Sequence, residues 1–215
     1  MNCCVVNNET NQPKLPATLP GFESVKRYWD RSSKCITARV LPGQYYLSNK
    51  DEIITTVLGS CISACIRDPV AGIGGMNHFM LPCGKNAGTC EHDSAAARYG
   101  GFAMEHLIND ILKYGGRRER LEIKLFGGGK MLGLMADVGQ RNITFVKEYL
   151  QTETLPIVAQ DLGGTCSRKI NYFPRSGRVM VKKLGLSQGI ELTRREREYL
   201  RSLEQAPIEG EIDLF

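Results

Sequence analysis

The stretch from residue 55 to residue 82 constrains the fold most strongly, because it places two apolar runs around one turn signal. The turn is Asp68-Pro69-Val70-Ala71, in which proline fixes φ and the aspartate side chain can accept hydrogen bonds from the backbone that follows. We expect the arms Cys61–Arg67 and Gly72–His78 to pair around this turn as an antiparallel hairpin.

In that register Cys61 lies directly opposite His78, and opposed residues have Cβ atoms about 4.5–5.5 Å apart. A thiol and an imidazole at that distance can form a thiolate–imidazolium pair, which is the working part of a cysteine nucleophile. A slip of one residue would put the two groups on opposite faces. Cys65 shares the predicted face and is a rival nucleophile, and His92, in a later loop, is a rival base without a defined register.

Several motifs around and after this hairpin resemble the CheD family of chemoreceptor glutamine deamidases. They occur in one order over roughly Leu41 to Leu184: LGSC at 58–61, GGMNHFMLP at 74–82, RYG and AMEHLIN within 98–109, FGGGKM at 126–131, VGQRN at 138–142 and DLGGTCSRKI at 161–170. The resemblance implies an α/β/β arrangement and the hydrolysis of selected receptor glutamines to glutamate in chemotaxis.

The resemblance also implies roles for three residues. The cysteine of LGSC, Cys61, would be the nucleophile, and the histidine of the Asn-His dipeptide, His78, would be the base. A threonine six residues before the cysteine, Thr55, would orient the imidazole. The implied partners are the cytoplasmic regions of methyl-accepting chemotaxis receptors and, in some members, a CheC-like phosphatase.

The chemistry of an amide explains why such residues are needed. An amide is a poor electrophile and ammonia leaves badly, so the reaction requires a strong nucleophile, a proton carrier and donors for the oxyanion. Cys61 and His78 could supply the first two. Gly59 and Ser60 are small, so nearby backbone N–H groups could reach the oxyanion, and Asn77 could help to place the amide.

Two other functions stay open from the residues. The chain could be a regulatory binding module for a phosphatase or a receptor, for which the acidic and apolar end PIEGEIDLF is a candidate docking segment. It could also hydrolyse receptor glutamyl methyl esters, because the same acyl-enzyme would serve both reactions.

Composition narrows the class of protein. The 215 residues are 42% hydrophobic and 24% charged, which indicates a globular chain that can bury one substantial core. From the strand and helix patterns along the chain, we expect one α/β domain with a β core, mixed or antiparallel, and two main helices. A net charge of +5 without a dense basic block argues against nucleic-acid binding. No apolar run approaches the ~18 residues of a membrane span, and the N-terminus does not resemble a secretory signal, so we expect a cytoplasmic protein with reduced cysteines.

The chain divides into three parts by composition: a polar extension over 1–40, the main domain over 41–184, and a charged tail over 185–215. Helices are expected from Ser94 to about Tyr114 and over 142–151. In the tail, Thr193 and Glu196 have the spacing of a capping box, which predicts a short helix to about Gln205.

No cofactor or metal is expected. Cys83, Cys90 and His92 lack the paired spacing of a zinc motif. The glycines at 127–129 fit neither a phosphate loop nor a dinucleotide loop, since Met131 replaces the required Ser or Thr and Leu132 the last glycine. These glycines more simply permit close packing of the backbone or line the approach to the site.

Overall fold

Two five-stranded sheets form the centre of the protein, and three helices lie around them in the part of the chain that the structure describes. The computed structural model describes residues 13–82, 94–131 and 135–205. The elements in chain order are β1 (Arg27–Asp30), β2 (Cys35–Arg39), β3 (Tyr45–Ser48), β4 (Ile53–Leu58), β5 (Ile62–Asp68), β6 (Ile73–Asn77), α1 (Ser94–Lys113), the short 3-10 helix Arg118–Arg120, β7 (Glu122–Gly127), α2 (Met135–Thr152), β8 (Ile157–Leu162), β9 (Arg168–Tyr172), β10 (Val179–Lys183) and α3 (Leu186–Gln205).

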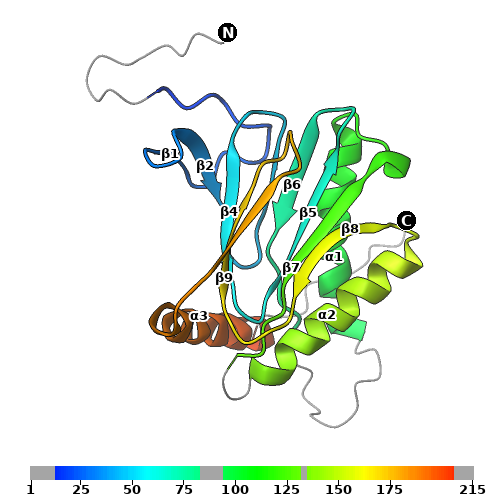
Figure 1. Ribbon diagram of the computed structural model, residues 1–215. Coiled ribbons are helices and arrows are strands. Elements are labelled where there is room, and N and C mark those ends of the chain that lie inside the picture. Colours follow the sequence, from blue (N-terminus) through cyan, green and yellow to red (C-terminus); the bar gives the residue numbers. More distant parts are fainter. Residues whose placement is uncertain (1–12, 83–93, 132–134, 206–215) are drawn as a thin grey trace.

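The sheets pack face to face, and α1 and α2 cover the outer face of the second one (Figure 1). The first sheet has the order β1-β2-β4-β9-β10, and the second has the order β3-β6-β5-β7-β8. Both mix parallel and antiparallel pairs. The layers are therefore α/β/β, which confirms the predicted fold class. The third helix, α3, lies across one end of the sheets near β4 and β9 (Figure 1).

The predicted hairpin forms, but its register differs by two residues from the prediction. Cys65 pairs with Met76, and an isolated bridge joins Ile62 to Phe79, so Cys61 is not opposite His78. The loop has four residues as expected, but it lies one position further along the chain, at 69–72, because Asp68 pairs with Ile73. Gly72 closes this loop in a left-handed conformation, with φ of 66°, and donates its N–H to the Asp68 carbonyl. A shift of two residues preserves which face each side chain occupies, so Cys61 and His78 still share a face.

The turn is held by the carboxylate of Asp68, as the sequence predicted. Its Oδ1 accepts hydrogen bonds from the N–H groups of Val70 and Ala71 at 2.8 and 3.0 Å. Its Oδ2 accepts from the Arg117 N–H and the Arg120 guanidinium, both at 2.8 Å. Burial alone would raise the pKa of this carboxyl, but the hydrogen bonds outweigh burial and lower the pKa to about 2.

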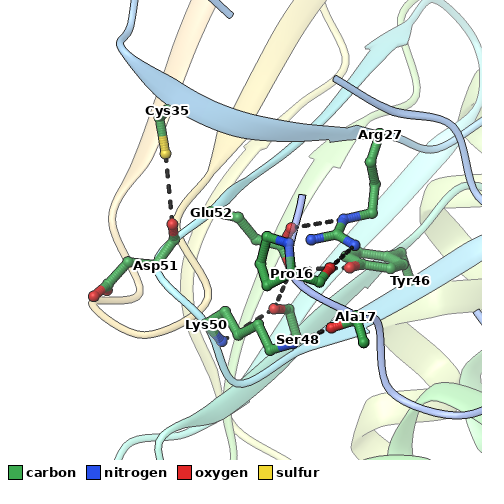
Figure 2. Close-up of polar contacts among 9 residues, drawn as sticks. All are labelled: Pro16, Ala17, Arg27, Cys35, Tyr46, Ser48, Lys50, Asp51 and Glu52. Atoms are coloured by element: carbon green, nitrogen blue, oxygen red, sulfur yellow. Dashed lines mark hydrogen bonds and ion pairs between the residues drawn. The ribbon is translucent and has the colours of Figure 1, made fainter. Parts of the chain in front are cut away.

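Residues 13–40, the described part of the polar extension predicted over 1–40, contain two strands that join the first sheet. β1 and β2 pair with each other, and β2 adds to β4 in parallel. Figure 2 shows the polar cluster behind this arrangement, in which the buried Glu52 accepts hydrogen bonds from Arg27, Tyr46 and Ser48. Because Arg27 also donates to the Pro16 carbonyl at 2.7 Å, the segment before β1 is tied to the domain.

Two helices begin earlier than the sequence patterns indicated. α2 starts at Met135 instead of Asn142, and α3 starts at Leu186 instead of near Thr193. The capping-box prediction is wrong, because the Thr193 hydroxyl donates to the Gly189 carbonyl inside the helix at 2.8 Å. Glu196 is therefore available for a contact elsewhere in the protein.

Among the described residues, no helix combines the length and the apolar character needed to cross a bilayer.

Asp68→Asn should lower the free energy of unfolding at pH 7 by about 2 kcal/mol. The variant loses the carboxylate charge that the surrounding hydrogen bonds stabilise, and the lowered pKa of Asp68 measures this stabilisation. The folded pKa lies below the unfolded value of about 3.9, so this contribution is complete above that pH and is lost as pH falls toward about 2. Urea unfolding of both proteins at several pH values measures it. A difference that stays constant from pH 7 to pH 2 would contradict this assignment.

Candidate active site

The predicted nucleophile lies where the chain crosses from one sheet to the other. β4 ends at Leu58 in the first sheet and β5 begins at Ile62 in the second, so Gly59, Ser60 and Cys61 form the link. Residues in such a link leave the ladder of their own strand. Their backbone N–H groups must then find acceptors outside the sheets. We call residues 59–61 the nucleophile turn.

The glycines at 127–129 hold this turn from one side. The N–H groups of Gly128 and Gly129 donate to the carbonyls of Cys61 and Gly59 at 2.8 and 2.6 Å. A Cβ atom on Gly127 would clash with the Cys61 carbonyl oxygen. The prediction that these glycines permit close packing of the backbone is therefore confirmed.

Asn142 holds the turn from another side, and the sequence patterns did not single it out. This asparagine is fully buried in α2. Its Nδ2 donates to the Ser60 carbonyl at 2.9 Å, and its Oδ1 accepts from the Leu81 N–H at 2.9 Å. The only sequence signal was its place in the VGQRN motif.

Cys61, His78 and Glu196 meet at one buried point between the sheets and α3. The Cys61 Sγ, a ring nitrogen of His78 and a carboxylate oxygen of Glu196 all lie within 4.8 Å of one another. Their exposed fractions are 0%, 2% and 1%. The sequence therefore predicted two members of this group correctly as neighbours, and it missed the third.

Thr56 orients the imidazole. The Thr56 hydroxyl donates to the Val40 carbonyl at 2.8 Å, and its oxygen lies 2.7 Å from the His78 Nδ1. Because the single hydroxyl proton is used by Val40, the oxygen must accept a proton from Nδ1. The other ring nitrogen, Nε2, then carries the lone pair, and it has no hydrogen-bond partner among the described residues.

The prediction that Thr55 orients His78 is wrong in this structure. Successive side chains of a strand point to opposite faces, and Thr56 shares the inner face of β4 with Ile54 and Leu58. Thr55 is on the other face, where its hydroxyl lies 2.9 Å from the Ile170 carbonyl and 2.7 Å from the Asn171 Oδ1.

Asn77 does not have the free amide that a role in placing substrate requires. Its Oδ1 accepts from the Ala64 N–H at 2.8 Å, and its Nδ2 donates to the Ala103 carbonyl at 3.0 Å. The side chain thus joins β5, β6 and α1. Its polar groups are consumed by the fold.

Burial sets the protonation states of the site. Burial lowers the pKa of His78 to about 3. Burial also raises the pKa of the Cys61 thiol well above its usual value, and the nearby Glu196 carboxylate raises it further. In this closed arrangement the pair is a neutral thiol beside a neutral imidazole.

Glu196 is bound by the nucleophile turn. Its Oε1 accepts from the Gly59 N–H at 2.8 Å and is 3.5 Å from the Cys61 N–H. Its Oε2 accepts from the Ser60 N–H at 2.8 Å and from the Ser60 hydroxyl at 2.7 Å. The turn therefore presents converging donors that bind a carboxylate, which is the geometry of an oxyanion hole.

The same three side chains are the candidates for a metal site in the described part of the chain. Both carboxylate oxygens of Glu196 already accept hydrogen bonds from the nucleophile turn, however, so their lone pairs are engaged by N–H and O–H donors. The arrangement therefore favours an anion site. Cys83, Cys90 and His92 lie outside the described residues.

Comparison with known proteins places the chain in a family. The family model for CheD, chemotactic sensory transduction, matches residues 80–183. The probable chemoreceptor glutamine deamidase CheD of Halorhodospira halophila is 48% identical over 204 residues, which cover 94% of each chain. The chain belongs to the CheD family. The CheD protein of Hahella chejuensis, also named a probable chemoreceptor glutamine deamidase, is 46% identical over 211 residues, 98% of this chain and all of the relative.

Thr56→Val should reduce the turnover of a glutamine substrate by about tenfold or more, because a mis-oriented base loses part of the 10²- to 10⁴-fold that acid–base catalysis contributes. Thr55→Val is the matched control and should leave turnover within about twofold, since that hydroxyl does not contact the imidazole. The measurement is kcat for each variant, with ¹⁵N chemical shifts of His78 to report the tautomer. A larger loss in Thr55→Val than in Thr56→Val would overturn the assignment.

Proposed function

We propose that this CheD protein deamidates selected glutamine side chains of methyl-accepting chemotaxis receptors, with Cys61 as the nucleophile and His78 as the base. The observation that carries the proposal is the convergence of the Cys61 thiol, the His78 ring and the N–H groups of the nucleophile turn. The names of the relatives supply the substrate class.

The first half of the reaction forms an acyl-enzyme. His78 Nε2 takes the thiol proton, and the Cys61 sulfur attacks the amide carbon of the glutamine side chain. The resulting oxyanion is bound by the N–H groups of Gly59 and Ser60. The tetrahedral intermediate expels ammonia as the imidazolium returns its proton to the leaving nitrogen, which leaves a glutamyl thioester.

The second half hydrolyses the thioester. His78 removes a proton from water, the hydroxide attacks the thioester carbon, and the thiol leaves with the proton. The net reaction consumes one glutamine amide and one water, and it produces one glutamate and one ammonia. The chemistry needs no redox step, and we expect no cofactor or metal in it.

We propose receptor cytoplasmic regions as the partners, and a cytoplasmic location for the enzyme follows from that proposal. Each event changes a neutral side chain into a carboxylate that can then be methylated. Binding to a CheC-like phosphatase and hydrolysis of receptor glutamyl methyl esters stay predictions from the sequence. The convergence of the nucleophile, the base and the backbone donors gives the deamidase a specific structural argument that the binding-module alternative lacks.

Incubation of a receptor cytoplasmic fragment with the enzyme should add about 1 Da at particular glutamines, because an amide nitrogen is replaced by oxygen through the acyl-enzyme. Peptide mass spectrometry measures the gain. Cys61→Ala should abolish it. Cys65→Ala is the matched control and should retain it, since Cys65 lies in the core on the neighbouring strand.

Each contrary outcome is informative. A mass gain that survives in Cys61→Ala would transfer the chemistry to another residue. Tight binding of the fragment without any mass gain, by the wild type and by the variants, would replace the enzyme with the binding module.

A further inference from the structure

The inner face of α3 contains a buried glutamate, Glu196. Among the residues described in this helix, Thr193, Glu196 and Leu200 are buried, and they follow one stripe at helical spacing. A glutamate at the centre of a buried stripe is costly unless its carboxylate is hydrogen-bonded. The opposite face of the helix is charged and exposed, with ion pairs that join Arg194 to Glu191 and Glu198.

The groups that bind the Glu196 carboxylate are the same groups that would bind the oxyanion in the proposed reaction. Glu196 receives hydrogen bonds from the Gly59 and Ser60 N–H groups and lies beside the Cys61 thiol. Glutamate is also the product of the proposed reaction. A product side chain at the end of catalysis would place its carboxylate against these same donors.

The docked helix closes the site. Cys61 is fully buried and His78 is 2% exposed, so a glutamine of another protein cannot reach the thiol while α3 is in place. The closure extends beyond Glu196, because the Tyr199 hydroxyl lies 2.6 Å from that of Tyr99 on α1. Helix α3 must leave for the enzyme to act on a protein.

The attachment of α3 suits a reversible contact. Among its described residues, α3 contributes only Leu200 to the buried core, and Tyr199 packs against that core while partly exposed. A cleft of about 470 Å³ separates part of the helix from β2 and β4, between Gln188 and Leu192 on one side and Val40 and Val57 on the other. Displacement of the helix would therefore leave the packing between the two sheets intact.

We propose that α3 is a tethered product mimic, which occupies the groove for a substrate helix and presents Glu196 in the place of the glutamate that the reaction forms. This inference rests on the proposed deamidase function and extends it to regulation. The resting enzyme is held inactive until the substrate helix displaces α3. The carboxylate beside Cys61 contributes to inactivity because it disfavours the thiolate.

The sharpest test replaces the mimic by a substrate. In Glu196→Gln, the amide carbon of the new side chain is held beside the Cys61 sulfur, so attack, loss of ammonia and hydrolysis by water should regenerate glutamate in the same chain. Peptide mass spectrometry of the full-length protein should show a gain of about 1 Da at residue 196, at a rate independent of protein concentration, because the reaction is intramolecular.

Two variants control this experiment. Glu196→Gln combined with Cys61→Ala should show no gain. Glu198→Gln places an amide two residues away on the exposed face, where the side chain of Glu198 is 58% exposed, and it should also stay unchanged. Conversion of both positions at equal rates would indicate non-specific deamidation and would overturn the proposal.

A second measurement tests the inhibition and separates its failure from failure of the function. Glu196→Ala should deamidate the receptor fragment about tenfold faster than the wild type, since the competent open state becomes more populated. Equal rates in these two proteins would overturn the product mimic alone. The same conclusion would follow if the Glu196→Gln variant modified the receptor fragment but kept its own amide at position 196. Absence of receptor deamidation in every variant would instead overturn the proposed function.

Discussion

The N–H groups of the nucleophile turn, which pair with no strand, are the constraint on which the rest of the site depends. The chain leaves one sheet at Leu58 and enters the other at Ile62, so the intervening donors have no strand to pair with. Buried donors require acceptors. The Glu196 carboxylate supplies them in this structure, and in the proposed reaction the oxyanion of the substrate would take its place.

The packing of two sheets brings the reacting groups together. His78 follows β6 in the second sheet, whereas the threonine that orients its ring lies on β4 in the first. Cys61 is in the turn between the sheets, and Asn142 of α2 ties that turn to the helical layer. Small shifts between the layers would therefore change the distance between nucleophile and base. Hydrogen bonds between the elements limit such shifts. The amide of Asn77, for example, joins β6 to β5 and to α1.

The sequence patterns predicted the structural features that depend on residues close together in the chain. The Asp68 turn, the two helices on the second sheet and the shared face of Cys61 and His78 follow from turn chemistry and from the periodicity of strands and helices. The choice between Thr55 and Thr56 could not be predicted in the same way, because it depends on which face of β4 meets the other sheet. The contact of Glu196 joins residues 137 positions apart in the chain, and its spacing from Thr193 suggested a local cap instead.

The rate at which iodoacetamide alkylates Cys61, mapped by peptide mass spectrometry in the wild type and in Glu196→Ala, tests the central claim most directly. If the Glu196 carboxylate on α3 covers the thiol and disfavours its ionisation, Cys61 should react about tenfold faster or more in the variant. Both the thiolate fraction of Cys61 and its exposure to the reagent should increase. Cys65, which is buried in the core, should react equally slowly in both proteins and thereby report that the fold is intact. An unchanged rate at Cys61 in the intact variant would contradict the account.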